Sequence, residues 1–256
     1  MARGIGGSLV RTQHGVVGLG GAGGGVAAPG AILAANLTGL WDDASATMTG
    51  ATWTNQTGGT NFTQGTGANQ PIAGTAINGR PTLQTDGSND RMDAAAISVL
   101  LTSSAFCVWG VARPLGALIA GPAVGTATRV FITDGGTGGY MAAGVATDPR
   151  GVSFDSGYDI TTTPGAMLTN TVYQWRLRLS GGTLYYRLRN TGGVVGEGSV
   201  TAGNLGAMTG LLRFGTDYLG ANAQSMDVAA IVTANIAPSA QQLTDMDAWT
   251  FSKWGV

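Results

Sequence analysis

Polar and apolar side chains alternate along residues 172–179, which is the pattern of a half-buried β-strand. The apolar side chains occupy every second position: Tyr173, Trp175, Leu177 and Leu179. Because successive strand side chains point to opposite faces, these four share one face. Residues 183–189 repeat the alternation, with three apolar side chains in phase: Leu184, Tyr186 and Leu188. The glycines of the intervening Ser180-Gly181-Gly182 supply the positive φ that tight turns require, so the two segments are predicted to form an antiparallel hairpin.

Further short apolar runs, separated by turns rich in Gly, Asn, Asp, Thr and Pro, predict more strands from about residue 36 onward. The strands expected are residues 105–112, 129–133, 151–154, 211–214 and 227–232. The last two are nearly all apolar, as central strands of a two-layer fold are. We therefore expect an all-β fold, a two-sheet antiparallel sandwich over residues 36–256.

One helix is predicted, over residues 239–254. Pro238-Ser239 followed by Gln242 indicates a capping box with Ser239 as the N-cap. Apolar side chains then fall within one broad helical stripe: Leu243, Met246, Phe251 and Trp254. This stripe predicts that the helix covers an edge of the sandwich and that residues 254–256 pack down against it.

Residues 1–35 have a different composition, with eleven glycines among the first 30 residues. Gly loses the most backbone entropy on ordering, and few side chains here could compensate for that loss. We therefore expect an extended Gly-rich N-terminal arm that is ordered only by contact with something else. Its own domain, a sister subunit and another protein are the alternatives, and an intermolecular anchor is the preferred one.

Three blocks of the sequence resemble a known family. Residues 39–45 (GLWDDAS) resemble a first-strand phrase of the LWLDAS type, and residues 69–71 with 77–90 (NQP, INGRPTLQTDGSND) resemble a stretch of the form NQP…INGKPALRFDGSDD. Residues 226–256 resemble a closing strand and terminal helix. The likeness is to the concanavalin A-like lectin/glucanase jelly rolls, specifically the laminin-G-like domains of phage virion and bacterial surface proteins. It covers about residues 36–256 and implies a jelly roll, a fold that hosts lectins, hydrolases and passive scaffolds.

The charge balance excludes some classes of function. The net charge is −1 and only 11% of the residues are charged, whereas nucleic-acid binders show a basic excess. A near-neutral surface favours association between copies, so a homo-oligomer is expected. No apolar stretch approaches the roughly 20 residues that span a membrane, and we identify no secretory signal. We therefore expect no nucleic-acid partner, no membrane insertion and synthesis in a cytoplasm.

Catalytic groups are scarce in this chain, which has one glutamate, one histidine and one cysteine: Glu197, His14 and Cys107. Glycosidases need a pair of carboxylates, and Glu197 stands alone in a turn-like Gly-Glu-Gly context. Cys107 lies in an apolar run that predicts a buried, inert thiol. The glycines of residues 18–23 lack the strand and helix of a dinucleotide-binding motif. We predict a protein without enzymatic activity or cofactor.

An acidic segment is the candidate metal site, with three carboxylates: Asp86, Asp90 and Asp93. Ca²⁺ prefers carboxylate and carbonyl oxygens. The spacing is not that of an EF-hand loop, and Asx side chains also stabilise tight turns without a metal. A structural turn is the preferred interpretation and calcium the alternative. Asp42-Asp43 is interpreted in the same way.

The outward face of the predicted hairpin carries the candidate binding residues: Arg176, Arg178, Tyr185, Arg187 and Arg189. Four guanidinium groups on paired strands repel one another unless an acidic group lies opposite them. One interpretation is a solvated outer face balanced by an Asp from a neighbouring strand. The other is a docking surface for an acidic partner subunit or an anionic glycan, because Arg binds carboxylates bidentately and stacks on rings.

The resemblance, taken with these exclusions, implies three candidate functions. The preferred hypothesis is a phage virion structural protein, located in the virion as a capsid decoration, head fibre or tail-associated subunit and anchored to other virion proteins by the arm. The second is a carbohydrate-binding adhesin that contacts a host-surface glycan. The third is a glycoside hydrolase.

Overall fold

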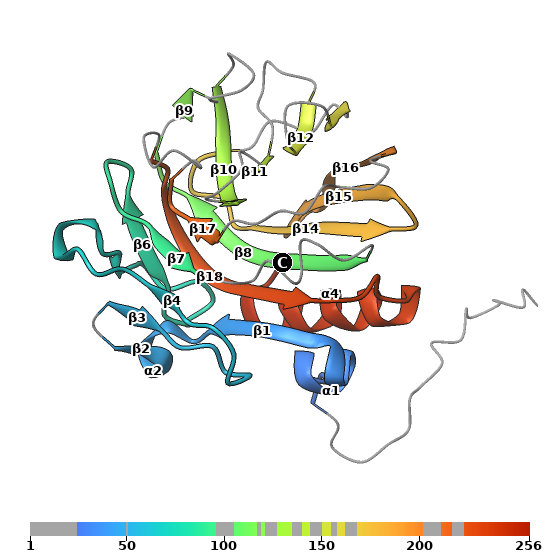
Figure 1. The fold of residues 1–256 in the computed structure, drawn as a ribbon, viewed down its shortest axis with the longest axis horizontal. Helices are drawn as coiled ribbons and strands as arrows, with labels where there is room; N and C mark the ends of the chain where they lie inside the picture. Colours follow the sequence, from blue (N-terminus) through green and yellow to red (C-terminus); the bar gives the residue numbers. More distant parts are fainter. Residues whose placement is uncertain are drawn as a thin grey trace, which may run out of the picture.

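Two antiparallel β-sheets and a C-terminal helix make up the described part of the chain (Figure 1). The computed structural model describes residues 25–49, 51–95, 105–116, 119–120, 127–134, 140–143, 150–154, 158–161, 168–201, 211–216 and 223–256. The prediction of an all-β, two-sheet antiparallel sandwich that ends in a helix is confirmed.

The first sheet has eight strands among the described residues, in the order β16-β15-β14-β8-β18-β6-β5, with β1 also paired to β18. Its strands are β1 (Leu37–Asp42), β5 (Ile72–Ala73), β6 (Leu83–Asp86), β8 (Phe106–Pro114), β14 (Tyr173–Ser180), β15 (Thr183–Asn190), β16 (Gly193–Thr201) and β18 (Ser225–Ala234). The predicted hairpin is β14-β15, and its turn glycines have φ of 57° and 74°. The seven side chains predicted to share its apolar face are all buried.

The second sheet has ten described strands, in the order β13-β12-β11-β10-β17-β7-β4-β3-β2, with β9 also paired to β10. Its strands are β2 (Met48–Thr49), β3 (Thr52–Trp53), β4 (Phe62–Thr63), β7 (Met92–Ala94), β9 (Ile119–Ala120), β10 (Ala127–Asp134), β11 (Tyr140–Ala143), β12 (Arg150–Phe154), β13 (Tyr158–Thr161) and β17 (Leu212–Phe214). Short helices interrupt the first third of the chain: α1 (Pro29–Leu33), η1 (Ala34–Asn36), α2 (Ala44–Thr47) and η2 (Gly67–Asn69).

Aromatic side chains from both sheets form the core between them. The Phe62 ring on β4 lies 4.8 Å from that of Trp41 on β1 and 5.1 Å from that of Phe214 on β17, both in edge-to-face contact. The Trp175 ring covers Gly110 of the neighbouring strand β8, where a Cβ atom would lie 2.1 Å from Cζ2 of the indole. Only glycine therefore fits at that position, because the two strands and the indole leave no space for a side chain.

A second core lies on the other face of the first sheet, under helix α4 (Ala240–Trp254) (Figure 1). The predicted capping box at Ser239 is present, with both of its hydrogen bonds formed. Three α4 side chains, Met246, Trp249 and Trp254, pack with residues of β8 and β18. Val256 is fully buried, so the end of the chain packs down as predicted. No helix in the described ranges is long and apolar enough to cross a membrane.

The predicted apolar stripe of α4 is wrong at Phe251, which is 57% exposed. The buried positions of the helix are 246, 249, 250 and 254. Position 251 lies roughly 200° around the helix from Trp249, because an α-helix has 3.6 residues per turn. Phe251 therefore faces away from the sheet.

The segment predicted as the arm includes residues that pack on the sandwich. Residues 1–24 lie outside the described residues. Ile32 and Leu33 of α1 belong to the second core, and the Gln242 side chain on α4 donates a hydrogen bond to the carbonyl of Ile32. The contacts that fix this segment are therefore made within the chain, at least from α1 onward.

Two truncations should separate these parts. Removing residues 1–24 is expected to leave the melting temperature within about 2 °C of the full chain. Removing residues 1–35 is expected to lower it by about 10 °C, because each fully buried Ile or Leu contributes about 1.5–3 kcal/mol and 1 kcal/mol shifts a domain of this size by about 2–4 °C. Differential scanning calorimetry measures both. An equal loss in the shorter truncation would assign residues 1–24 to the folded core.

Candidate functional site

Three adjacent strands, β14, β15 and β16, bring polar side chains to the outer face of the first sheet beside α4. Their register places the residues in cross-strand rows. One row holds Arg176, Arg187 and Glu197, and the next holds Arg178, Tyr185 and Ser199. Directly opposite residues are close enough for their side chains to interact. The five predicted binding residues thus lie together on one surface.

The Asp247 carboxylate on α4 is the counterion of this surface. It lies 2.5 Å from Nη1 of Arg187, 3.6 Å from Nη1 of Arg176 and 3.8 Å from Nη1 of Arg189. It also accepts a hydrogen bond of 3.0 Å from the amide of Gln174. The sequence pattern predicts a balancing Asp from a neighbouring strand or an external acidic partner, whereas this aspartate belongs to the C-terminal helix.

Arg176 is the most enclosed of the three arginines that approach Asp247, with a side chain 14% exposed. Burial lowers the pKa of its guanidinium from the ordinary value, and the charge of Asp247 opposes that effect. Its Nη1 atom is buried without a hydrogen-bond partner among the described residues, as are the Nε atoms of Arg187 and Arg189. One carboxylate therefore serves three guanidinium groups and leaves several of their donors unused.

A groove of about 360 Å³ spans both rows, and Asp247 is not among its lining residues. Its lining residues are Arg176, Arg178, Tyr185, Tyr186, Arg187, Glu197, Gly198 and Ser199. The Arg178 guanidinium carbon lies 4.3 Å from the centre of the Tyr185 ring, and Tyr185 is 37% exposed. In the described part of the chain, no carboxylate lies within ion-pairing distance of Arg178. The groove thus combines a stacked cation, a partly exposed aromatic ring, a carboxylate and a hydroxyl.

Glu197 corrects the sequence analysis, which placed it in a turn. It lies in the middle of β16, directly across from Arg187. The two glycines that flank it suggested a turn, but they sit opposite Leu188 and Tyr186, whose large side chains fill the inner face of the sheet.

Two carboxylates of the predicted metal site, Asp86 and Asp90, accept hydrogen bonds from backbone amides of the same turn. Oδ1 of Asp86 accepts hydrogen bonds from the backbone amides of Ser88 (2.7 Å), Asn89 (3.2 Å) and Asp90 (3.4 Å). Burial raises the pKa of Asp86, but these backbone hydrogen bonds outweigh it together and leave that pKa below its ordinary value. Oδ2 of Asp90 accepts from the Asp86 amide at 3.0 Å. This is the geometry of the structural turn that was the preferred interpretation.

Asp93, the third carboxylate of that prediction, faces Arg213 of the neighbouring strand β17. Arg213 donates from Nε at 2.6 Å and from Nη2 at 3.0 Å, and Nε of Arg91 lies 3.9 Å away. Asp42 likewise accepts from Gln56 and pairs with Lys253. Within the described ranges, no group of three or more His, Cys, Asp or Glu side chains is placed to hold a metal ion.

Of the two other candidate reactive residues, only Cys107 lies within the described residues. Cys107 is fully buried in the second core, and burial raises the pKa of its thiol. His14 lies outside the described residues.

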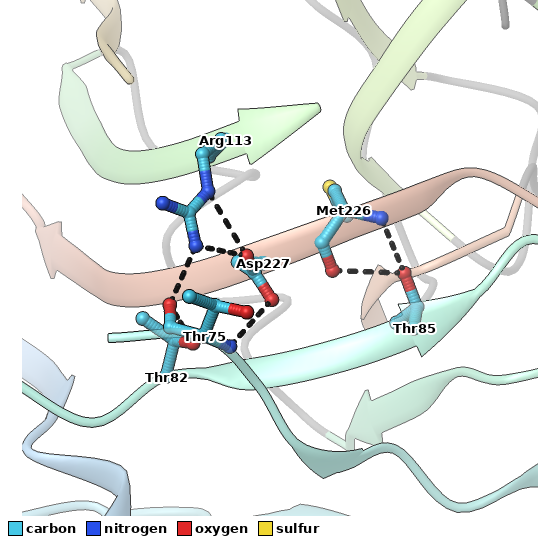
Figure 2. A network of polar contacts seen from close by, with 6 residues as sticks. All are labelled: Thr75, Thr82, Thr85, Arg113, Met226 and Asp227. Carbon is cyan, nitrogen blue, oxygen red and sulfur yellow. Dashed lines mark hydrogen bonds and ion pairs between the residues drawn. The ribbon is translucent and has the colours of Figure 1, made fainter. Parts of the chain in front are cut away.

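A buried polar network at the other end of the first sheet was missed by the sequence analysis (Figure 2). Asp227 of β18 is fully buried and accepts from Nε of Arg113 at 3.0 Å and from the amide of Thr75 at 3.3 Å. Arg113 also donates to the Thr75 carbonyl at 2.6 Å. The signal was an aspartate inside a nearly apolar strand, since a buried charge requires a partner. All members of this network are satisfied, so it anchors the segment that contains Thr75.

The fold is similar to several solved structures. Domain 4 of AbnA, a GH43 extracellular arabinanase from Geobacillus stearothermophilus in complex with arabinotriose, has a TM-score of 0.60 at 13% identity, covering 82% of this chain and 98% of that one. Trypanosoma rangeli sialidase has a TM-score of 0.53 at 13% identity, covering 83% of this chain and 32% of the sialidase. The binding domain of Paraclostridial Mosquitocidal Protein 1 has a TM-score of 0.52 at 11% identity, with 85% and 52% covered.

The sequence comparisons gave no match, either to a protein-family model or to a curated protein. At 11–13% identity the structural likeness concerns the fold and not the site. The chain is therefore a two-sheet antiparallel β-sandwich of the kind found in an arabinanase domain, a sialidase and the binding domain of a mosquitocidal protein.

Proposed function

We propose that this chain is a non-catalytic carbohydrate-binding module whose ligand occupies the groove on β14, β15 and β16. The observation that carries the proposal is the Arg178–Tyr185 stack, beside Glu197 and Ser199 in a groove of about 360 Å³. That volume lies in the range of small-ligand sites, about 300–1,000 Å³. An aromatic face packs against the C–H groups of a sugar ring, while charged and hydroxyl side chains bond its hydroxyl groups. Such a site binds one or two sugar residues.

The carboxylates around the groove support a role without catalysis. Glycosidases generally use two carboxyl groups on either side of the bond that is cleaved. Among the described residues that line the groove, Glu197 is the one carboxylate. The nearby Asp247 contacts three arginines and Gln174, which hold its charge in place. A lone exposed carboxylate suits hydroxyl binding better than acid–base chemistry.

Two structural neighbours support the choice of ligand class. The arabinanase domain, which matches over 98% of its length, was solved in complex with arabinotriose. The neighbour from the mosquitocidal protein is its binding domain. A β-sandwich of this fold thus binds a short oligosaccharide in at least one of these proteins. The side chains of the groove in this chain can bind the same class of ligand.

Replacing Tyr185 with alanine is expected to weaken glycan binding about tenfold, because the loss of an aromatic platform costs about 1.4 kcal/mol. A glycan array identifies the ligand, and isothermal titration calorimetry measures the change in Kd. Phe251→Ala is the matched control, since Phe251 is also an exposed aromatic but lies on α4. Equal losses in both variants, or no glycan ligand for the native chain, would contradict the proposal.

The same ligand should emerge intact after prolonged incubation with the protein. Reducing-end assays and mass spectrometry detect cleavage. A hydrolytic activity that disappears on Glu197→Gln would instead favour the glycoside hydrolase hypothesis.

A virion structural role is the second candidate. The observation that favours it is the Gly-rich composition of residues 1–30, together with the resemblance to laminin-G-like domains of phage particles. In this proposal the arm anchors the sandwich to other virion proteins, copies associate, and the groove faces a host-surface glycan. Copurification of the full chain with intact particles, and its loss on deletion of residues 1–24, tests the role independently of glycan binding.

A further inference from the structure

The outer face of β14, β15 and β16 carries more positive than negative charge. Its four arginines face two carboxylates among the described residues, Asp247 and Glu197. The whole chain has a net charge of −1, so this excess is local. Guanidinium groups remain protonated at any ordinary pH. Among the described residues, this face therefore carries an excess of two positive charges.

Arg178 is placed to receive an anion. The other three arginines approach Asp247, whereas the contact of Arg178 is the ring of Tyr185. Stacking uses the flat face of a guanidinium group and leaves its in-plane N–H donors available. Those donors match the two oxygens of a carboxylate. The ring also restricts the guanidinium group before a ligand arrives, which reduces the entropy lost on binding.

Two arginines that line the groove also hold buried donors without hydrogen-bond partners among the described residues. Nη1 of Arg176 and Nε of Arg187 are buried without hydrogen-bond partners in the described part of the chain, and both residues line the groove. Buried donors without partners are unfavourable, because they have lost their bonds to water. A bound anion would neutralise part of the excess charge beside them and relieve their mutual repulsion.

Glu197 determines how a ligand is oriented in the groove. Its carboxylate accepts hydrogen bonds from sugar hydroxyl groups and repels a second carboxylate. A ligand that carries both groups therefore binds with its carboxylate toward Arg178 and its hydroxyl groups toward Glu197. An acidic protein fits less well, because specific protein interfaces need about 800 Å² from each partner around an apolar centre, whereas this groove is small and polar.

We propose that the groove is selective for acidic sugars, which carry a carboxylate, and that Arg178 recognises that carboxylate. This inference rests on the proposed carbohydrate-binding function and adds its ligand class. Both a uronic acid within a polysaccharide and a terminal nine-carbon acidic sugar present this chemistry.

The test compares each acid with its uncharged counterpart. The probes are trigalacturonic acid with its methyl ester, and sialyllactose with lactose, titrated into the full chain by calorimetry at low salt. We expect at least one acid to bind ten or more times tighter than its neutral partner, and the stronger of the two identifies the source. Arg178→Gln is expected to reduce this preference to less than threefold, and Arg178→Lys to an intermediate value, because lysine keeps the charge and loses the bidentate geometry. Arg80→Gln removes the same charge from an exposed turn and should leave the preference unchanged.

Three outcomes would overturn the inference. Equal binding of acidic and neutral sugars, with both weakened by Tyr185→Ala, would leave the carbohydrate site intact and remove its charge selectivity. Unchanged preference in a folded Arg178→Gln protein, checked by its melting curve, would remove Arg178 from recognition. Binding of a hexaglutamate peptide in the groove, with no sugar bound, would replace both proposals with a protein-docking surface.

Discussion

Replacing Asp227 with alanine is expected to lower the free energy of unfolding by about 3–5 kcal/mol, because it leaves a mostly buried arginine without its counterion. Asp227 is fully buried, and the Arg113 side chain is 16% exposed. The carboxylate also accepts from the Thr75 amide, and a Cβ atom on Gly74 would lie 2.4 Å from its Oδ1 atom. The loss therefore removes an ion pair and the anchor of the residue 74–82 segment together (Figure 2).

Urea unfolding measures this loss. An unchanged slope of the unfolding free energy against urea concentration would show that the variant buries as much surface in its native state as the native chain does. Asp93→Ala is the matched control, because the Arg213–Asp93 pair also joins adjacent antiparallel strands through Nε and Nη2 of the arginine. The Asp93 carboxylate is 24% exposed, whereas Arg213 is only 10% exposed, so a smaller loss of about 2 kcal/mol is expected, between the values for exposed and buried pairs. If the two variants lost equal stability, the interior network would not be a main anchor of the fold.

The local elements of this fold could be predicted because their signals are local. The β14-β15 hairpin needs only a two-residue alternation and two turn glycines, and the start of α4 needs only Ser239 and Gln242. Both signals act between residues that are near in sequence. Glu197 shows the limit of such reasoning. The same Gly-Glu-Gly pattern is compatible with a turn and with a strand whose inner face is covered by side chains of the neighbouring strand. Only the side chains of that neighbouring strand distinguish the two structures.

The candidate site depends on a contact that no local pattern records. The alternation predicted that the arginines share a face, but not that Asp247, 58 or more residues away in sequence, lies among three of them. The helix position follows from Met246 and Trp249 packing on β8 and β18, and this also turns Phe251 toward solvent. Which arginine remains without a carboxylate is a consequence of that packing. The selectivity assigned to Arg178 could therefore be inferred only from the structure.

Asp247→Asn is expected to change stability and ligand binding in opposite directions. The substitution keeps the shape of the side chain and removes the charge that three arginines share. A loss of about 2 kcal/mol is expected, between the value for exposed pairs and that for buried pairs, because Asp247 is 14% exposed. The same change raises the positive potential of the groove, so acidic sugars should bind about threefold tighter while neutral sugars bind as before.

Asp245→Asn is the control for this variant, since Asp245 lies on the same helix and accepts a hydrogen bond from Gln241 instead. It changes the net charge equally and should alter neither stability nor affinity. Thermal unfolding and calorimetric titration with the acidic probes measure the two effects, and added salt should reduce the gain in affinity because it screens the exposed charges. Unchanged stability would show that Asp247 is not the counterion of the cluster. Weaker binding of acidic sugars would instead mean that Asp247 holds Arg176 and Arg187 in the orientation that the ligand needs.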